Sequence, residues 1–120
     1  MVNRRPAPRD FLPLTPAIAH ILLALADEDR HGYAIMQEVE RMTDGAVRMG
    51  PGTLYGTLKR MLASRLVEEV KAGRPEDAQG DDERRRYYRA TALGAAVLAA
   101  ETERMSALLG AARAKRVRAR

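Results

Sequence analysis

The chain has 120 residues, of which 46% are hydrophobic and 31% charged, which predicts one domain with a modest core. It has no cysteine, which excludes a disulfide framework and a thiolate metal site. The two histidines stand apart and no Ser–His–acid constellation is visible, so we expect no metal, no cofactor and no enzyme. The apolar run 17–26 is too short to cross a bilayer, so we expect no membrane partner and a cytoplasmic location.

The formal net charge of +5 is unevenly distributed along the chain. Residues 1–14 carry +2 and residues 113–120 carry +5, so the stretch between them is −2. The Arg- and Pro-rich residues 1–13 are predicted to form a flexible or loosely docked basic arm. Two central stretches, 45–65 and 84–100, contain no acid at all. The basic residues of the central part of the chain that could form an anion-binding site therefore lie mostly in these two stretches.

Two helices are predicted before residue 45. Thr15 suits a helix cap and Pro16 suits the first helical turn, so the first helix covers about 17–26. A second helix is predicted over about 31–43, because apolar residues recur there at helical spacing between outward-facing polar ones. His31 is expected to help cap this second helix.

The segment from Met49 to Leu62 is the most informative part of the chain. Pro51 can begin a helix without wasting a backbone donor, and one apolar stripe follows at helical spacing. The opposite face carries hydroxyls and cations, which suits insertion into a groove lined with phosphates. The alternative is a solvated face with Tyr55 half packed against the core. The candidate DNA contacts of this segment and the residue just before it are Arg48, Gly52, Thr53, Tyr55, Lys59 and Arg60.

Two strands and a long helix follow. The strands are predicted over 66–70 and 85–89, separated by about fourteen residues, and Thr91 caps a helix over about 92–114. Three helices, a hairpin and a helix form a mainly α fold with a small β-hairpin, the layout of a winged helix-turn-helix. The predicted organisation is an arm over 1–13, a winged-helix domain over 14–90, a dimerisation helix over 91–114 and a basic tail over 115–120.

Three arginines stand at the base of the hairpin. Arg84, Arg85 and Arg86 could grip phosphate or enter a minor groove. The alternative is charge pairing with the acidic run 81–83 that immediately precedes them.

The last helix carries an apolar stripe that is too long for a small three-helix core to cover. An equivalent helix from a second chain could cover it, since isologous pairing is the commonest solution. The alternative is that the helix folds back on its own domain. The basic tail after it is either a solvated helix end or a source of nonspecific DNA affinity. The predicted dimer-interface residues are Leu93, Val97, Leu98, Met105, Leu108 and Leu109.

Several motifs together resemble the PadR family of bacterial transcriptional regulators, over residues 12–112. These motifs are Leu14-Thr15-Pro16, His31-Gly32-Tyr33-Ala34-Ile35, Pro51-Gly52-Thr53-Leu54-Tyr55, Lys59-Arg60 and Arg85-Arg86-Tyr87-Tyr88-Arg89-Ala90-Thr91. The resemblance implies a dimeric winged-helix repressor with its third helix in the major groove, its wing near the backbone and its last helix dimerising. Its implied partners are double-stranded DNA, a second copy and a small-molecule effector. The alternative function is a winged-helix module for protein–protein contact without specific DNA binding.

The sequence departs from the family pattern in three places. Ser64-Arg65 stands where such proteins usually have a glycine, so either Arg65 adopts a left-handed conformation at a cost of about 1 kcal/mol or the turn differs. The wing loop 71–84 is rich in acids, which phosphate would repel. The chain also has no tryptophan, so the stacking of planar ligands on tryptophan seen in some drug-sensing relatives does not transfer.

Overall fold

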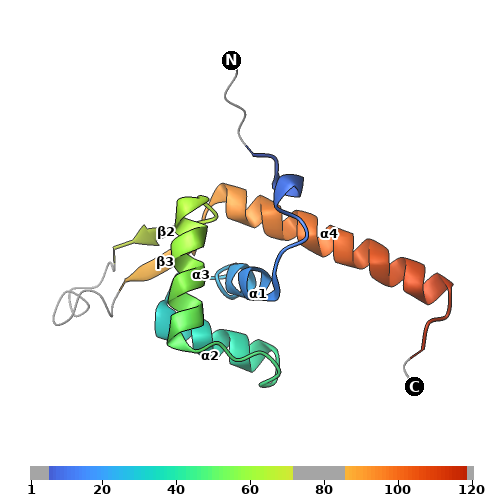
Figure 1. The fold of residues 1–120 in the computed structure, drawn as a ribbon, viewed down its shortest axis with the longest axis horizontal. Helices are drawn as coiled ribbons and strands as arrows, with labels where there is room; N and C mark the ends of the chain where they lie inside the picture. The colour runs from blue at the N-terminus through green and yellow to red at the C-terminus, as the bar shows by residue number, and fades with distance from the viewer. Residues whose placement is uncertain (1–5, 72–85, 119–120) are drawn as a thin grey trace, which may run out of the picture.

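The computed structural model describes residues 6–71 and 86–118. Three helices pack together, a small sheet lies at one end of the third, and the long last helix crosses the domain and extends beyond it (Figure 1). The predicted fold class, mainly helical with a small antiparallel sheet, is confirmed. The elements are η1 (Pro8–Phe11), α1 (Pro16–Ala24), β1 (Arg30–His31), α2 (Gly32–Met42), α3 (Pro51–Ala63), β2 (Val67–Val70), β3 (Tyr87–Ala90) and α4 (Ala92–Ala114).

The helix starts follow the predicted capping chemistry. The side chains of Thr15, His31 and Thr91 each accept a hydrogen bond from the backbone N–H three residues later, at 3.3, 3.2 and 3.0 Å. Each bond satisfies one of the backbone donors that a first helical turn leaves without a partner. The three predicted caps are confirmed.

The end of α3 is built on a left-handed arginine. Arg65 has φ 64°, so the first of the two expected alternatives is the one observed. The Leu66 N–H donates to the Met61 carbonyl at 2.9 Å, and the Arg65 N–H donates to the Leu62 carbonyl at 3.1 Å. This pair of bonds is a Schellman motif, which satisfies the last carbonyls of the helix. Arg65 therefore keeps a strained left-handed conformation, and the chain turns at this residue into β2.

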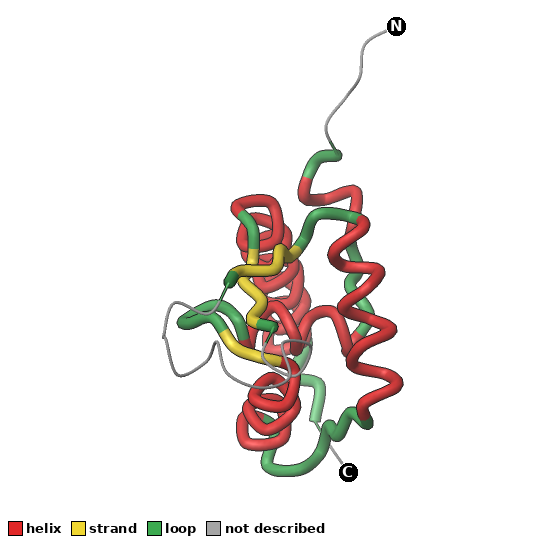
Figure 2. Tube along the Cα trace, turned by 90° about the vertical axis from the view of Figure 1, so that its left-hand side faces the viewer, coloured by secondary structure: helices red, strands yellow, loops and turns green. Residues whose placement is uncertain are grey.

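The sheet has three strands in the order β1-β3-β2, all antiparallel (Figure 2). The sequence did not predict β1, which is two residues long and pairs Arg30 with Tyr88. Because side chains alternate along a strand, one of the adjacent Tyr87 and Tyr88 points inward. Tyr88 is the buried ring, and Tyr87 packs edge-to-face on His31 with centroids 5.5 Å apart. This short strand therefore fixes the start of α2 to the base of the wing.

One core is shared by α1, α2, α3, the sheet and the first half of α4. Val97 is fully buried in it, so the prediction that Val97 belongs to a dimer interface was wrong. Leu93 and Leu98 are half-buried and pack against the same core. The physical reason is that α4 begins directly beside the α3–β2 turn and lies on α1 before it leaves the domain. The alternative that α4 folds back on its own domain therefore holds for its first half.

Part of the N-terminal arm is ordered against α4. Pro8–Phe11 forms the 3-10 helix η1, and the side chains of Phe11 and Leu12 pack on the core. The buried carboxylate of Glu101 accepts a hydrogen bond from the Leu14 N–H at 2.8 Å and one from Arg104 Nε at 2.5 Å. The structured domain thus begins before residue 14, earlier than the predicted boundary.

Replacing Glu101 by glutamine is expected to lower stability at neutral pH and to matter less in acid. The hydrogen bond from Arg104 holds the pKa of the Glu101 carboxyl below its usual range; burial raises it, and the Leu14 N–H lowers it further. A group with a lowered folded-state pKa stabilises the fold above its unfolded pKa, about 4.3, and loses this contribution as pH falls through the folded pKa. Urea unfolding at pH 7 and below pH 4 measures the difference, with exposed Glu103→Gln as control. If the free energies of unfolding of the wild type and Glu101→Gln differed by the same amount at every pH, the stabilising role of the ionised Glu101 carboxylate would be contradicted.

Candidate nucleic-acid interface

The N-terminus of α3 presents backbone donors to the surface. Gly50 is the N-cap and has no side chain to offer, and Pro51 has no N–H. The amides of Gly52 and Thr53 precede the first intrahelical bond, in which the Leu54 N–H donates to the Gly50 carbonyl at 3.0 Å. Unpaired amides and the positive end of the helix dipole together favour an anion. No acid lies in the first turn.

The two faces of α3 are divided as the sequence predicted. Leu54, Leu58 and Met61 are buried, and the side chains of Thr53, Tyr55, Lys59 and Arg60 are exposed. The sequence did not single out Thr57, which is buried and donates from Oγ1 to the Thr53 carbonyl at 2.7 Å. This bond satisfies a hydroxyl that would otherwise be costly to bury.

Two glycines lie at the centre of the exposed face. Gly52 and Gly56 are one turn apart, and Lys59 and Ala63 continue the same face. A Cβ added at Gly52 would meet no atom within 4 Å, and one at Gly56 would meet only Nη1 of Arg60, at 3.9 Å. Packing inside the chain therefore does not require glycine at either position. Their absent side chains leave the helix backbone open to close approach from outside, a feature that the sequence analysis missed at Gly56.

The predicted cations differ in how they are compensated. Arg48 pairs with Glu40 at 3.4 Å, and Arg86 pairs with Glu69 at 3.3 Å. Both pairs are exposed, and exposed pairs contribute at most about 1 kcal/mol, so phosphate can replace either carboxylate. Within residues 6–71 and 86–118, neither Lys59 nor Arg60 forms an ion pair, so both cations of α3 lack a carboxylate partner there.

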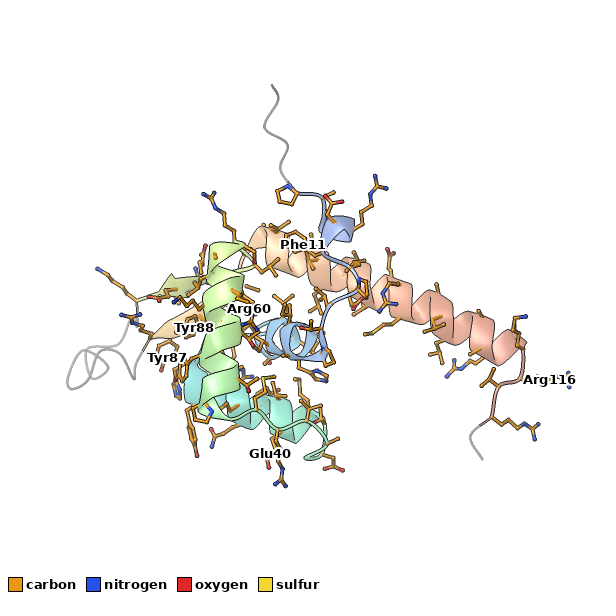
Figure 3. The ribbon with its side chains drawn as sticks, viewed as in Figure 1. Phe11, Glu40, Arg60, Tyr87, Tyr88 and Arg116 are labelled. Atoms are coloured by element: carbon orange, nitrogen blue, oxygen red, sulfur yellow. The ribbon has the colours of Figure 1, made fainter. Side chains whose placement is uncertain are left out.

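Arg60 points away from the centre of this face. Its Nη2 donates to the Thr57 hydroxyl at 3.3 Å, and the side chain borders a cavity shared with Pro13, Thr15 and Ile18 on the α1 side (Figure 3). Arg60 is therefore at the edge of the candidate interface. Arg84 and Arg85, and the acidic run 81–83 that was their alternative partner, lie outside the described residues.

Tyr55 is partly exposed and also packs against its own chain. Its ring is 43% exposed, yet it lies directly on Gly32, where an added Cβ would be 2.3 Å from the phenol oxygen. Gly32 is the first residue of α2, and the next residue, Tyr33, is 61% exposed. Tyr33 was not among the predicted contacts, although the sequence places it in the first turn of α2. Two tyrosines therefore flank the start of α2 beside the exposed face of α3.

Replacing Gly32 by alanine is expected to displace the Tyr55 ring from its packed position on residue 32 and to weaken DNA binding several-fold. The clash is with the end of a side chain that can rotate away, so we expect a loss of stability of about 1 kcal/mol, at the low end for overpacking. Fluorescence anisotropy with a DNA fragment measures binding, and thermal melting measures stability. In a Tyr55→Ala background the same Gly32→Ala change should have little further effect on binding. Equal losses in both backgrounds would show that Gly32 does not act through Tyr55.

Two other kinds of site are absent from residues 6–71 and 86–118. No group of three His, Asp or Glu side chains is placed to hold a metal ion there. No helix in those segments has the length and apolar character needed to span a membrane.

Three packed helices followed by the antiparallel strands β2 and β3 define a winged-helix fold. Residues 21–100 match the model of the transcriptional regulator PadR-like family. The chain belongs to this family, and the resemblance found in its motifs is confirmed. Members of this family are transcriptional regulators.

Relatives of similar sequence include one named regulator. The chain is 40% identical over 79 residues to the transcriptional regulator Rv3488 of Mycobacterium tuberculosis. The aligned region covers 66% of this chain and 65% of that protein. It is 39% identical over 90 residues to an uncharacterized 37.1 kDa protein in transposon Tn4556 of Streptomyces fradiae. That match covers 75% of this chain but 23% of the Streptomyces protein.

Solved structures share the fold. A PadR family transcription regulator from Clostridium difficile matches with a TM-score of 0.68 and 21% identity, over 86% of this chain and 100% of that one. A transcriptional regulator from Clostridium thermocellum matches with a TM-score of 0.66 and 24% identity, over 92% and 93% of the two chains. At these identities the comparison establishes the shared fold.

Proposed function

We propose that this PadR-family regulator is a sequence-specific DNA-binding repressor that acts as a homodimer on an inverted-repeat operator. The observation that carries the proposal is the exposed face of α3, which combines an uncapped N-terminus, two surface glycines and Lys59, a cation without an ion-pair partner among residues 6–71 and 86–118. No acid lies between residues 45 and 65 to oppose a phosphate backbone.

Each part of the face has a role in this proposal. The amides of Gly52 and Thr53 and the Thr53 hydroxyl bind one phosphate at the helix N-terminus. Lys59 contacts the opposite side of the groove, and Gly56 lets the helix backbone lie close to the bases. Tyr55 and Tyr33 donate their hydroxyls to the sugar–phosphate backbone.

The remaining basic residues act at the periphery. Arg48, Arg60 and Arg86 supply further phosphate contacts, and Arg84 and Arg85 are proposed to add to them. Their contribution is sequence-independent, because phosphate contacts fix register and orientation without reading bases. Specificity then resides in the centre of α3.

Dimerisation gives the operator its symmetry. Two copies related by a two-fold axis present their α3 helices to half-sites about one helical turn apart, roughly 34 Å. The exposed Met105, Leu108 and Leu109 of α4 supply the apolar surface for this pairing. A small molecule or another signal that changes the angle between the two α3 helices would release the operator.

An electrophoretic mobility shift with the DNA upstream of the protein's own gene tests the proposal. We expect a discrete retarded band that survives excess competitor DNA and weakens as salt is raised. The rival function, a winged-helix module for protein partners, has the exposed tyrosines as its supporting observation. Absence of any retarded band at low salt, where even nonspecific binding appears, would favour that rival.

A further inference from the structure

Two of the cations assigned to the candidate interface are each held by a carboxylate from a neighbouring element. Arg48, in the loop before α3, lies 3.4 Å from Glu40 of α2 (Figure 3). Arg86, directly before β3, donates from Nη1 to Glu69 of β2 at 3.3 Å. A phosphate that reaches either arginine therefore competes with a carboxylate of the protein itself.

The exposure of these side chains leaves both contacts open to exchange. Arg48 and Glu40 have side chains 74% and 53% exposed, and those of Arg86 and Glu69 are 50% and 42% exposed. Exposed ion pairs contribute little to stability, because water screens them and ordering two long side chains costs entropy. A phosphate can therefore take either arginine without disturbing the fold.

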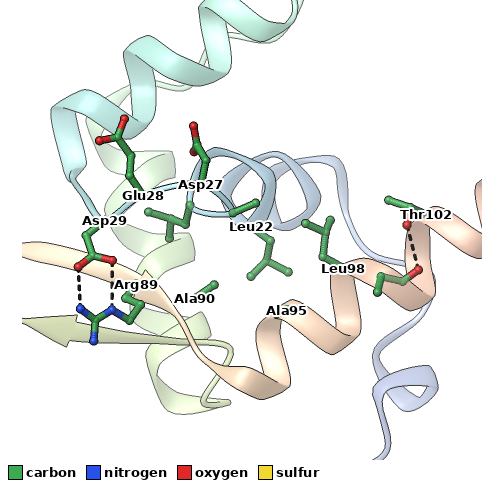
Figure 4. Close-up of a pocket in the computed structure, with 12 residues that line it drawn as sticks. Leu22, Asp27, Glu28, Asp29, Arg89, Ala90, Ala95, Leu98 and Thr102 are labelled. Atoms are coloured by element: carbon green, nitrogen blue, oxygen red, sulfur yellow. Dashed lines mark hydrogen bonds and ion pairs between the residues drawn. The ribbon is translucent and has the colours of Figure 1, made fainter.

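The pair between Asp29 and Arg89 has a different geometry. Asp29 accepts two hydrogen bonds from Arg89, at 3.1 Å from Nε and 2.8 Å from Nη2 (Figure 4). Such a fork is stronger and more specific in geometry than a single contact. Arg89 lines a groove formed by α1, the turn after it, β3 and α4. Arg89 therefore joins parts of the fold, whereas Arg48 and Arg86 are held loosely.

We propose that Glu40 and Glu69 limit the affinity of this protein for DNA by holding Arg48 and Arg86 until a phosphate displaces them. This inference rests on the proposed function and names two residues that adjust its affinity. Each carboxylate opposes binding twice, because it must release its arginine and then stands unpaired near the phosphate. Phosphate contacts carry no sequence information, so the two acids restrain binding to all DNA. The centre of α3 is left to distinguish the operator from other sites.

The same exchange reduces the salt dependence of binding. A free arginine that neutralises a phosphate releases about one condensed cation from DNA. An arginine that leaves a carboxylate to do so exposes that carboxylate, which attracts a cation from solution in turn. The net number of ions released is therefore smaller while Glu40 and Glu69 are present.

Fluorescence anisotropy with a labelled duplex of arbitrary sequence, over a series of salt concentrations, tests the proposal on the full chain. Glu40→Gln and Glu69→Gln are each expected to tighten binding by about 3- to 5-fold at low salt and to steepen the log–log slope by up to about one unit. A merely structural role predicts weaker binding instead. Both sites are exposed, so the melting temperature should shift by no more than about 2 °C.

Control variants separate the released arginine from a general loss of negative charge. Glu103→Gln removes an exposed carboxylate from α4, and Asp29→Asn removes the partner of Arg89 in the groove. Both should leave the slope unchanged. In an Arg48→Ala background, Glu40→Gln should no longer steepen the slope, because no arginine remains there to be released.

The outcomes distinguish this inference from the proposed function. Unchanged affinity and slope in both glutamine variants, with wild-type binding intact, would overturn this inference alone. Equal steepening in the control variants or in the Arg48→Ala background would do the same. A wild type that binds no DNA even at low salt would overturn the proposed function, and the restraint by Glu40 and Glu69 with it.

Discussion

Replacing Gly94 by alanine is expected to destabilise the protein by about 3 kcal/mol, the upper end of the usual range for overpacking. A Cβ at this position would lie 2.0 Å from the backbone carbonyl oxygen of Leu66 and 3.1 Å from Cδ2 of Leu22. The first neighbour is backbone and cannot rotate aside. Relief would require α4 to move away from the turn between α3 and β2.

That movement would break a compact junction. The Thr91 hydroxyl donates to the Arg65 carbonyl at 2.6 Å and caps α4 by accepting from the Gly94 N–H at 3.0 Å. The Thr91 N–H donates to the Leu66 carbonyl at 3.1 Å. The strained end of α3 is therefore held by the start of α4, and displacing α4 weakens both.

Urea unfolding of Gly94→Ala measures the loss, with Gly110→Ala as the matched control. Gly110 lies in the same helix, and a Cβ there would meet no atom within 4 Å. The control should gain about 0.5 to 1 kcal/mol, because alanine favours a helix over glycine. Equal effects at the two glycines would contradict the close approach at Gly94.

Replacing Gly56 by glutamate is expected to reduce DNA affinity by roughly 100-fold or more, since like charges brought together at an interface cost several kcal/mol. The carboxylate would stand in the centre of the exposed face of α3, against phosphate and within the closest approach of the helix. The fold itself should tolerate the change, because the site is open and glutamate favours a helix over glycine.

Fluorescence anisotropy with the operator measures this loss, and thermal melting checks the fold. Gly110→Glu is the control, because it makes the same chemical change at an open site in α4. It should leave DNA affinity within about twofold of the wild type. Wild-type affinity in Gly56→Glu would remove the centre of α3 from the interface.

The sequence predicted the elements well where the signal is local. Thr15, His31 and Thr91 cap helices through contacts that span three residues, and α4 has the predicted bounds Ala92–Ala114. Strand β1 was missed because two polar residues carry no periodicity, and only its pairing with β3 makes it a strand.

Features that depend on the assembled fold were not predictable. From the sequence, the apolar stripe of α4 was predicted to form a single interface. In the structure, Val97 is buried in its own domain and Leu109 is exposed. Which half is covered depends on where α1 lies. The pairing of Arg48 with Glu40 and the seat of Tyr55 on Gly32 likewise join segments whose proximity is set by packing. The candidate contacts on α3 could be proposed from the sequence because one helix carries them all.

The salt dependence of operator binding by Lys59→Ala tests the central claim most directly. If Lys59 neutralises a phosphate, the log–log slope of affinity against salt becomes about one unit less steep than for the wild type. Arg9→Ala, which removes an exposed cation from η1, should leave the slope unchanged. An unaltered slope in Lys59→Ala would contradict the assignment of the exposed face of α3 as the DNA-binding surface.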